Sequence, residues 1–373
     1  MIKKEINEIR QTLKYTNCSI HKLAGCFIDT EKHIHVVSHD QFLCLAEEEQ
    51  HKYFDLVKKA LSGRVGKNLI NLEFETGHTE KRDMLLDVVN SGLETDEQVL
   101  KLFETIKDNY DYPDNYYIMT FYGVYDVPGK TSDGIEMEDA SDEVYKFILT
   151  LMCPMKPSKA GLTYNAIENT LENAVRNLMV EPPIHGFLYP SFNNRGTDIH
   201  NILMYSKQSE DLDEGLINEV FGCKSPATAK KQSEMFIDAI SAIESFTFEN
   251  AVSLCSAISE KEEESKEDEE KMVIGAVETV NMLEASGVKS EDLEEFKNTL
   301  IKATKEGGEI LANNILPNTN KLKIKTGITE ITLPMEFADG IEVQRIEGRN
   351  CLVIEINDEL TVNGMKVNKY DFD

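Results

Sequence analysis

Groups of lysine and arginine beside predicted turns are the side chains of this sequence best suited to bind a ligand, because their N–H groups donate to phosphate and carboxylate oxygens. Arg195, in the segment "HGFLYPSFNNRGTDIHNILMYSK", lies at the tip of a predicted β-hairpin. The whole set flanks turns or strand ends: Lys156, Lys159, Arg195, Lys207, Lys230, Lys231, Lys321, Lys323 and Lys325. In "NKLKIKTG", strand alternation places the last three lysines on one face. These residues form one phosphate-binding surface only if the fold brings their turns together.

A secondary basic cluster consists of Lys58, Lys59, Arg64 and Lys67 and follows a predicted helix. Its sequence "SGRVGKN" has the glycines and lysine of a phosphate loop, but the glycines are too closely spaced and no Ser or Thr follows the lysine. A helix end followed by a turn accounts for the glycines more simply.

Local roles compete with ligand binding for every one of these basic groups. Lysines maintain solubility and protect exposed sheet edges from pairing with other chains. A turn arginine such as Arg195 can bond the local backbone or pair with Asp198. Taken one at a time, the basic groups favour these local roles.

No set of residues in the sequence matches a metal, cofactor or catalytic motif. His33, His35 and His39 share one side of a predicted strand, but no carboxylate–histidine pattern of ligand spacing accompanies them. The sequence contains no G-x-S-x-G, no H-E-x-x-H and no dinucleotide fingerprint. We therefore expect no metal, no cofactor and no catalytic residues. An enzyme whose groups meet across distant segments stays open as the third alternative.

Composition indicates a globular protein that is strongly acidic. The chain has 373 residues, 41% of them hydrophobic, and a net charge of −28. This charge repels polyanions at long range and counts against nucleic-acid binding, although a local basic face remains compatible with it. No apolar run approaches the ~20 residues that span a bilayer, and no signal core is present. Seven scattered cysteines suit reduced thiols, so we expect a cytoplasmic protein without membrane contact.

The pattern of apolar runs predicts an α+β fold with a central antiparallel sheet flanked by helices. Runs at 115–126, 143–155 and 185–205 are joined by short connections, which predicts three adjacent antiparallel strands.

Four segments are predicted along the chain. A smaller N-terminal α/β unit covers 1–110, and the central sheet with its helices covers 111–245. A helical, acidic segment covers 246–316, in which the charge run 260–271 is predicted to be an exposed helix or linker without a deep ligand site. Short strands at 317–373 form a C-terminal β segment, expected to pack on the central sheet or pair with it.

Characteristic stretches are distributed along the chain: "KKEINEIRQTLK", "LSGRVGKNLINLEF", "DVPGK", "CPMKPSKAGLTY" and "GFLYPSFNNRGTDI". Together they resemble an uncharacterised family of clostridial-type bacteria, catalogued as a domain of unknown function. This resemblance extends over nearly the whole chain and implies no activity.

From residue 115 onward, the order of elements is similar to that of another family. The strand pair "YYIMTFYGVYDV" and "VYKFILTLMCPMK", the strand–helix run "NILMYSKQSEDLDEGLINEVFGC" and the β tail "GITEITLPMEFADG" resemble bacterial nucleoid-associated proteins of the NdpA type. Residues 1–110 lie outside this resemblance, which implies a dimeric, non-enzymatic DNA-binding protein.

The leading hypothesis is therefore a cytosolic homodimer that binds DNA through the basic residues above, in nucleoid association or in defence against foreign DNA. The alternative is an acidic module that binds a basic protein partner or the translation machinery.

Overall fold

The computed structural model describes residues 1–35, 37–75, 77, 79–130, 136–173, 177–210, 212–268, 273–304, 310–316, 320–356, 359–362 and 365–367. The chain forms two compact units, Met1–Lys231 and Gln232–Asp373. This division differs from the predicted boundaries at 110, 245 and 316.

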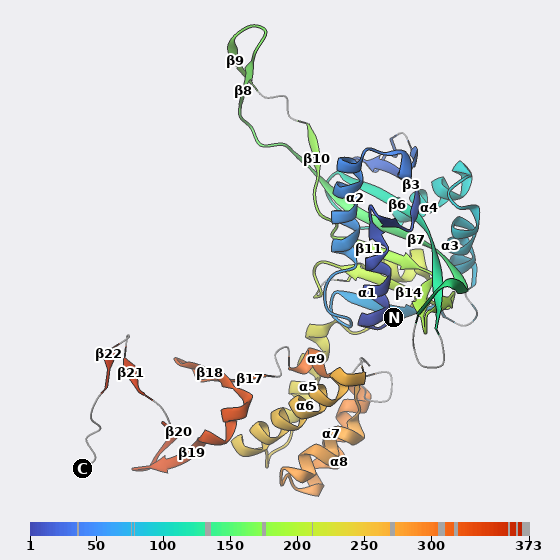
Figure 1. The fold of residues 1–373 in the computed structure, drawn as a ribbon. Helices are drawn as coiled ribbons and strands as arrows, with labels where there is room; N and C mark the ends of the chain where they lie inside the picture. The colour runs from blue at the N-terminus through green and yellow to red at the C-terminus, as the bar shows by residue number, and fades with distance from the viewer. Residues whose placement is uncertain are drawn as a thin grey trace. The chain divides into compact units, whose positions relative to one another are not determined.

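The first unit is built on an eight-stranded antiparallel sheet with the order β4-β3-β6-β7-β11-β14-β5, in which β10 also pairs with β7 (Figure 1). The prediction of three adjacent strands is confirmed, since Leu149 lies between Phe121 and Leu188 and Leu188 lies opposite Leu203. The strands of the sheet are β3 (Ile20–Ile28), β4 (Ser38–Gln41), β5 (Leu69–Glu73), β6 (Tyr116–Lys130), β7 (Glu136–Pro157), β10 (Leu178–Val180), β11 (His185–Tyr189) and β14 (Asn201–Ser206).

Helices cover both faces of this sheet. One face packs against α3 (Thr79–Ser91), α4 (Asp96–Asn109) and the π-helical η2 (Gly215–Phe221); the other packs against α1 (Lys3–Gln11), α2 (Glu47–Ala60) and the short η1 (Phe42–Cys44). Neighbouring residues enter opposite cores: Ile118 and Met152 lie on the α3 side, and Met119 and Leu151 lie on the α2 side. A sheet buried on both faces needs apolar residues at consecutive positions, which explains the unbroken apolar runs.

The longer strands of residues 1–110 belong to the central sheet. Their strand β3 pairs with β6 through eight residue pairs, from Ile20↔Gly123 to Ile28↔Tyr116. Their strand β5 pairs with β14 at the far edge, from Leu69↔Tyr205 to Glu73↔Asn201. β3 pairs with β4 on its other side, but one edge of β3 and the paired edge of β5 are satisfied by later parts of the chain, so the N-terminal segment belongs to the central sheet.

Three hairpins extend from the sheet layers. β1 (Leu13–Lys14) pairs with β2 (Asn17–Cys18), and β12 (Ser191–Asn193) pairs with β13 (Gly196–Asp198). β8 (Leu162–Asn165) pairs with β9 (Thr170–Asn173) in a long projection beyond the end of β7 (Figure 1). We call this projection, residues 156–173 and 177–180, the arm.

The second unit combines a helical core with small hairpins. Its core includes Phe236, Leu254, Leu283 and Phe296. The helices are α5 (Ala229–Ser241, which begins in the first unit), α6 (Phe248–Asp268), α7 (Ala276–Ala285), α8 (Ser290–Ala303), α9 (Ala312–Ile315) and η3 (Met335–Gly340). The paired strands are β15 (Val273–Ile274) with β16 (Ile310–Leu311), β17 (Lys321–Lys325) with β18 (Glu330–Pro334), β19 (Ile341–Ile346) with β20 (Arg349–Ile354), and β21 (Thr361–Val362) with β22 (Met365–Lys366).

The expected pairing of the C-terminal strands with the central sheet is not found among the described residues, where β17 to β22 pair only as two-stranded hairpins. Each pair is joined by a short connection, so a strand meets its sequence neighbour first. No helix in the described parts of the chain is long and apolar enough to cross a membrane. All seven cysteines are free thiols.

Candidate nucleic-acid interface

Two basic groups that lie far apart in the sequence meet at one end of the sheet. The turn after α2 runs beside the end of β14, where the Ser206 N–H donates to the Asn68 carbonyl at 2.8 Å. The Asn68 side-chain amide donates to the carbonyls of Ser206 (3.1 Å) and Lys207 (3.3 Å), across a sequence separation of 138 residues in the case of Ser206. We call Lys59, Arg64, Lys67 and Lys207 the sheet-end cluster.

Glycines shape this end of the sheet. Ala60, the last residue of α2, lies against Gly186 of β11; a Cβ at Gly186 would stand 3.7 Å from the Ala60 Cβ and 2.8 Å from the Thr150 carbonyl oxygen. Gly63 and Gly66 have φ angles of 121° and 83°, which L side chains rarely adopt. The glycines of "SGRVGKN" therefore turn the chain after a helix, as the sequence predicts, and carry Arg64 and Lys67 to the end of β14.

Among the residues described, the lysines of this cluster lie apart from acidic side chains. Lys59 and Lys207 are exposed and Lys67 is half-buried, and within the described part of the chain none of the three is in an ion pair. Lysines elsewhere do pair with acids: Lys22 with Glu94 at 3.0 Å, Lys52 with Glu48 at 2.9 Å and Lys323 with Glu330 at 2.7 Å. Lys58 instead lies over the Phe54 ring, 5.5 Å from its centroid.

Arg195 lies at the hairpin tip that the sequence predicts, but its contact with Glu8 is structural. Asn194 and Arg195 have φ angles of 51° and 58°, typical of the two central residues of a tight hairpin turn. The Arg195 guanidinium donates to one Glu8 carboxylate oxygen from Nε (3.2 Å) and Nη2 (3.1 Å), and the Tyr125 hydroxyl donates to the same oxygen at 3.0 Å. The two side chains of this ion pair are each about one-fifth exposed, and the pair joins the hairpin to α1.

Asp198 has local partners at the base of the same hairpin. It accepts hydrogen bonds from the side-chain amides of Asn193 (2.6 Å) and Asn201 (2.7 Å) and from the His200 backbone N–H (2.9 Å). Partial burial acts to raise the pKa of Asp198, but these hydrogen bonds outweigh it and the pKa is lowered. The carboxylate is thus held ionised within its own turn.

The length of β7 separates Arg195 from Lys156. Next to Arg195, the Thr197 N–H donates to the Glu143 carboxylate of β7 at 2.9 Å. Lys156 lies thirteen residues further along this strand, which is roughly 40 Å at about 3.3 Å per residue. Arg195 and Lys156 therefore lie at opposite ends of the sheet and do not contact the same short stretch of a ligand.

The remaining predicted residues lie in three further places. Lys156 and Lys159 are exposed at the base of the arm, and Lys230 and Lys231 are exposed at the start of α5. Lys321, Lys323 and Lys325 lie on β17 in the second unit, where the burial pattern confirms their shared exposed face. The sequence singled out thirteen basic residues, nine in the main set and four in the secondary cluster. From the main set, the structure places Lys207 beside the secondary cluster. Asn68, which joins them, carries no signal in the sequence alone.

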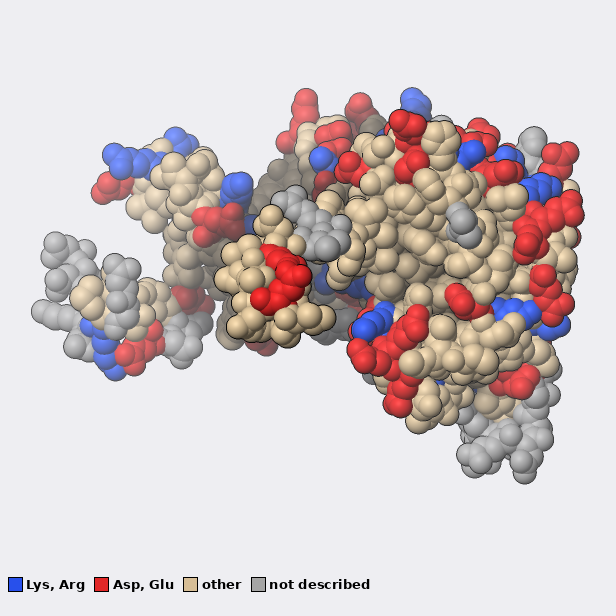
Figure 2. Space-filling view, turned by 90° about the horizontal axis from the view of Figure 1, so that it is seen from above, with Lys and Arg blue, Asp and Glu red and all other residues tan. Residues whose placement is uncertain are grey.

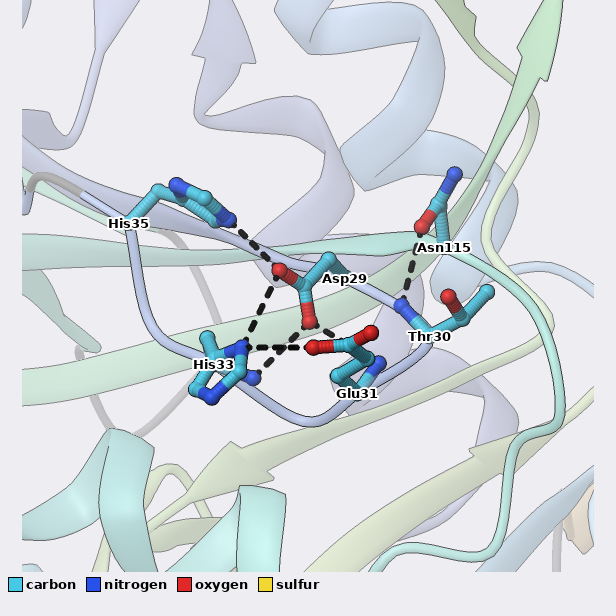
Figure 3. A network of polar contacts seen from close by, with 6 residues as sticks. All are labelled: Asp29, Thr30, Glu31, His33, His35 and Asn115. Carbon is cyan, nitrogen blue, oxygen red and sulfur yellow. Dashed lines mark hydrogen bonds and ion pairs between the residues drawn. The ribbon is translucent and has the colours of Figure 1, made fainter.

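Two of the three histidines considered as metal ligands, His33 and His35, lie in a network of polar contacts within a loop (Figure 3). Asp29 accepts from the backbone N–H groups of Glu31 and His33, both at 2.9 Å, and its Oδ2 lies 2.8 Å from His35 Nε2. These contacts, led by the His33 N–H, lower the pKa of Asp29 to about 2. His39 lies instead 3.2 Å from Asp96. No group of three potential ligands that could hold a metal ion is found among the residues described.

The acidic run 260–271 begins as helix, as predicted, since α6 extends to Asp268. Lys261 pairs with Glu278 of α7 beside a groove of about 740 Å³ lined by Ala257, Val277 and Met282 among others. The side chains of Glu263 and Glu264, part of the predicted exposed stretch, lie outside the described residues.

Most of the face seen in Figure 2 is uncharged; among its charged side chains acids are more prominent, and lysines and arginines form small groups between them. A mixed α+β protein with a two-sided antiparallel sheet and a few local basic clusters is the class that these features define. The chain belongs to the family described as a domain of unknown function, DUF4317, whose model matches residues 1–365. Neither a curated protein nor a solved structure matches the chain, and nothing in these comparisons supports the resemblance to NdpA-type proteins.

Proposed function

We propose that this protein binds double-stranded DNA without sequence preference, through phosphate contacts from the sheet-end cluster. The observation that supports this proposal is the junction of two basic groups at Asn68, described above. Lysine and arginine side chains that converge on one surface supply the sequence-independent part of DNA affinity.

The local charge favours such contacts despite the net charge of −28. Residues 56–68 contain four basic residues and no acid, and residues 201–209 contain Lys207 and no acid. Salt screens charges beyond about 10 Å at 0.1 M ionic strength, so the cluster acts at short range while distant acids are damped. Binding of this kind is weak and strongly dependent on salt.

The test compares two triple variants of equal charge. Lys59→Gln/Lys67→Gln/Lys207→Gln removes three lysines of the cluster, and Lys14→Gln/Lys101→Gln/Lys302→Gln removes three exposed lysines elsewhere. Fluorescence anisotropy with a short DNA duplex at several salt concentrations gives the slope of log affinity against log salt. Each lost phosphate contact flattens this slope by about 0.9, so we expect a change of about 2 to 3 for the cluster variant only.

Arg195→Ala provides a second control, because Arg195 lies at the other end of the sheet and should leave the slope unchanged. Absence of wild-type binding at low salt, with the protein folded, would remove the DNA proposal and favour the protein-partner alternative. Equal losses in the two triple variants would show that net charge, not the cluster, governs binding.

A further inference from the structure

The arm carries an apolar surface that its own unit leaves uncovered. It extends from the end of β7 away from the sheet (Figure 1). Leu162, Tyr164 and Leu171 are 66%, 61% and 66% exposed. Further exposed apolar residues continue from the turn at the tip to the base: Ile167, Leu178, Met179 and Val180. Scattered single apolar residues are normal on a surface, but a contiguous set on one projecting element indicates an interaction site.

Strand register shows that the two faces of the arm's hairpin differ in polarity. Tyr164 lies directly opposite Leu171, and Leu162 lies two residues from Tyr164, so these three side chains share one face. The other face carries Thr163 opposite Glu172, with Asn165 opposite Thr170. One face is therefore apolar and the other polar, as in a strand pair that packs against something on one side only.

A hairpin of this kind is poorly stabilised by itself. An isolated two-stranded hairpin is marginally stable in water, and an additional packing surface on its apolar face is what stabilises it. Covering that face with another apolar surface would contribute about 25 cal/mol per Å² of area removed from water.

The charges of the arm indicate which partner covers it. The outgoing segment of the base carries Lys156 and Lys159, and residues 154–167 include no acid. The returning segment carries one half-buried acid, Glu181, beside Pro154. The tip carries Glu168 and Glu172, and residues 168–175 include no basic residue. Two arms aligned antiparallel place the positive base of each beside the negative tip of the other, whereas a parallel alignment places like charges together. This pattern is complementary to itself, as a twofold symmetric interface requires.

We propose that the arm is a dimerisation element, in which two copies of this chain pack the apolar faces of their arms together, antiparallel, about a twofold axis. Leu162, Tyr164 and Leu171 form the contact, and the base lysines and tip glutamates set its direction. The proposal is independent of DNA binding, because it uses none of the sheet-end cluster.

The first experiment measures the mass of the full chain by analytical ultracentrifugation at micromolar concentrations. We expect a dimer for the wild type and a monomer for Leu162→Ser/Tyr164→Ser/Leu171→Ser. The matched control, Thr163→Ser/Asn165→Ser/Thr170→Ser, changes the polar face and should stay dimeric. Circular dichroism checks that each variant is folded. A monomeric wild type, or a dimer that survives the apolar-face variant, would overturn the proposal.

The second experiment reverses charges to test whether the base lysines and tip glutamates contribute to the contact between arms. Lys156→Glu/Lys159→Glu makes both ends of the arm negative, and Glu168→Lys/Glu172→Lys makes both ends positive, so each variant should be monomeric by itself. Mixing the two should restore a heterodimer, because each base then faces an oppositely charged tip. An absence of heterodimer in the mixture would overturn the contribution of these charges to the contact.

Discussion

Asp29 is the carboxylate whose surroundings shift its titration most clearly. Its hydrogen bonds, chiefly from the His33 N–H and then from His35, lower its pKa from 3.8 to about 2. A carboxylate with a folded pKa below its unfolded value contributes stability above about pH 4 and loses that contribution as the pH falls through about 2. We therefore expect Asp29→Asn to make thermal stability less sensitive to acid between these pH values.

The direct measurement is a titration of carboxyl carbons by NMR, with a midpoint for Asp29 about two pH units below that of an exposed aspartate. A midpoint for Asp29 near its ordinary value of 3.8 would contradict the network of Figure 3.

Single residues show how far the sequence could predict the site. The tip position of Arg195 follows from the polar turn between two apolar runs, because turn chemistry is local. Its partner Glu8 lies 187 residues earlier, and no local pattern encodes such a pairing. The junction between Lys207 and the turn at 62–68 was unpredictable for the same reason, since it depends on the register between β5 and β14.

Among the elements, the β12–β13 hairpin is fixed to α1 by the Arg195–Glu8 pair. Both side chains are about four-fifths buried, so solvent screens the pair only in part. Arg195→Met would remove both guanidinium N–H donors from the Glu8 carboxylate, and we expect a loss of about 1–2 kcal/mol in the free energy of unfolding. Urea unfolding followed by tyrosine fluorescence measures this loss; Lys14→Met, at an exposed position, is the control. A loss no larger than that of the control would contradict the structural role.

Elements with strong apolar patterns were predicted well, and the arm was not. The runs that became β6, β7 and β11 are buried on both faces, so their sequences are distinctive. The segment of β9 and β10 has no such pattern, because its few apolar residues are spaced among Asn and Glu. A strand that is exposed within its own chain lacks the composition of a buried strand.

At the scale of the whole molecule, the strand order of the sheet indicates which fragments of the chain can fold by themselves. Residues 1–110 supply β3 and β5, but four other strands lie between them in the sheet. We expect a fragment of residues 1–110 to remain unfolded and a fragment of residues 1–231 to fold, because a folding unit needs its complete core. Amide NMR spectra distinguish the two results. A dispersed spectrum from the shorter fragment would show that the predicted N-terminal unit is autonomous after all.

The position of β5 at the far edge also matters during synthesis. This strand leaves the ribosome long before β14, and at about 5–20 residues per second the delay is on the order of 10 s. For that time Leu69, Ile70 and Leu72 have no sheet to join. A nascent chain in this state exposes an unpaired apolar strand, which is a typical target of ribosome-associated chaperones. β5 is thus made before β6, β7, β11 and β14, but it can join the sheet only after β14, the last strand of the sheet, has been made.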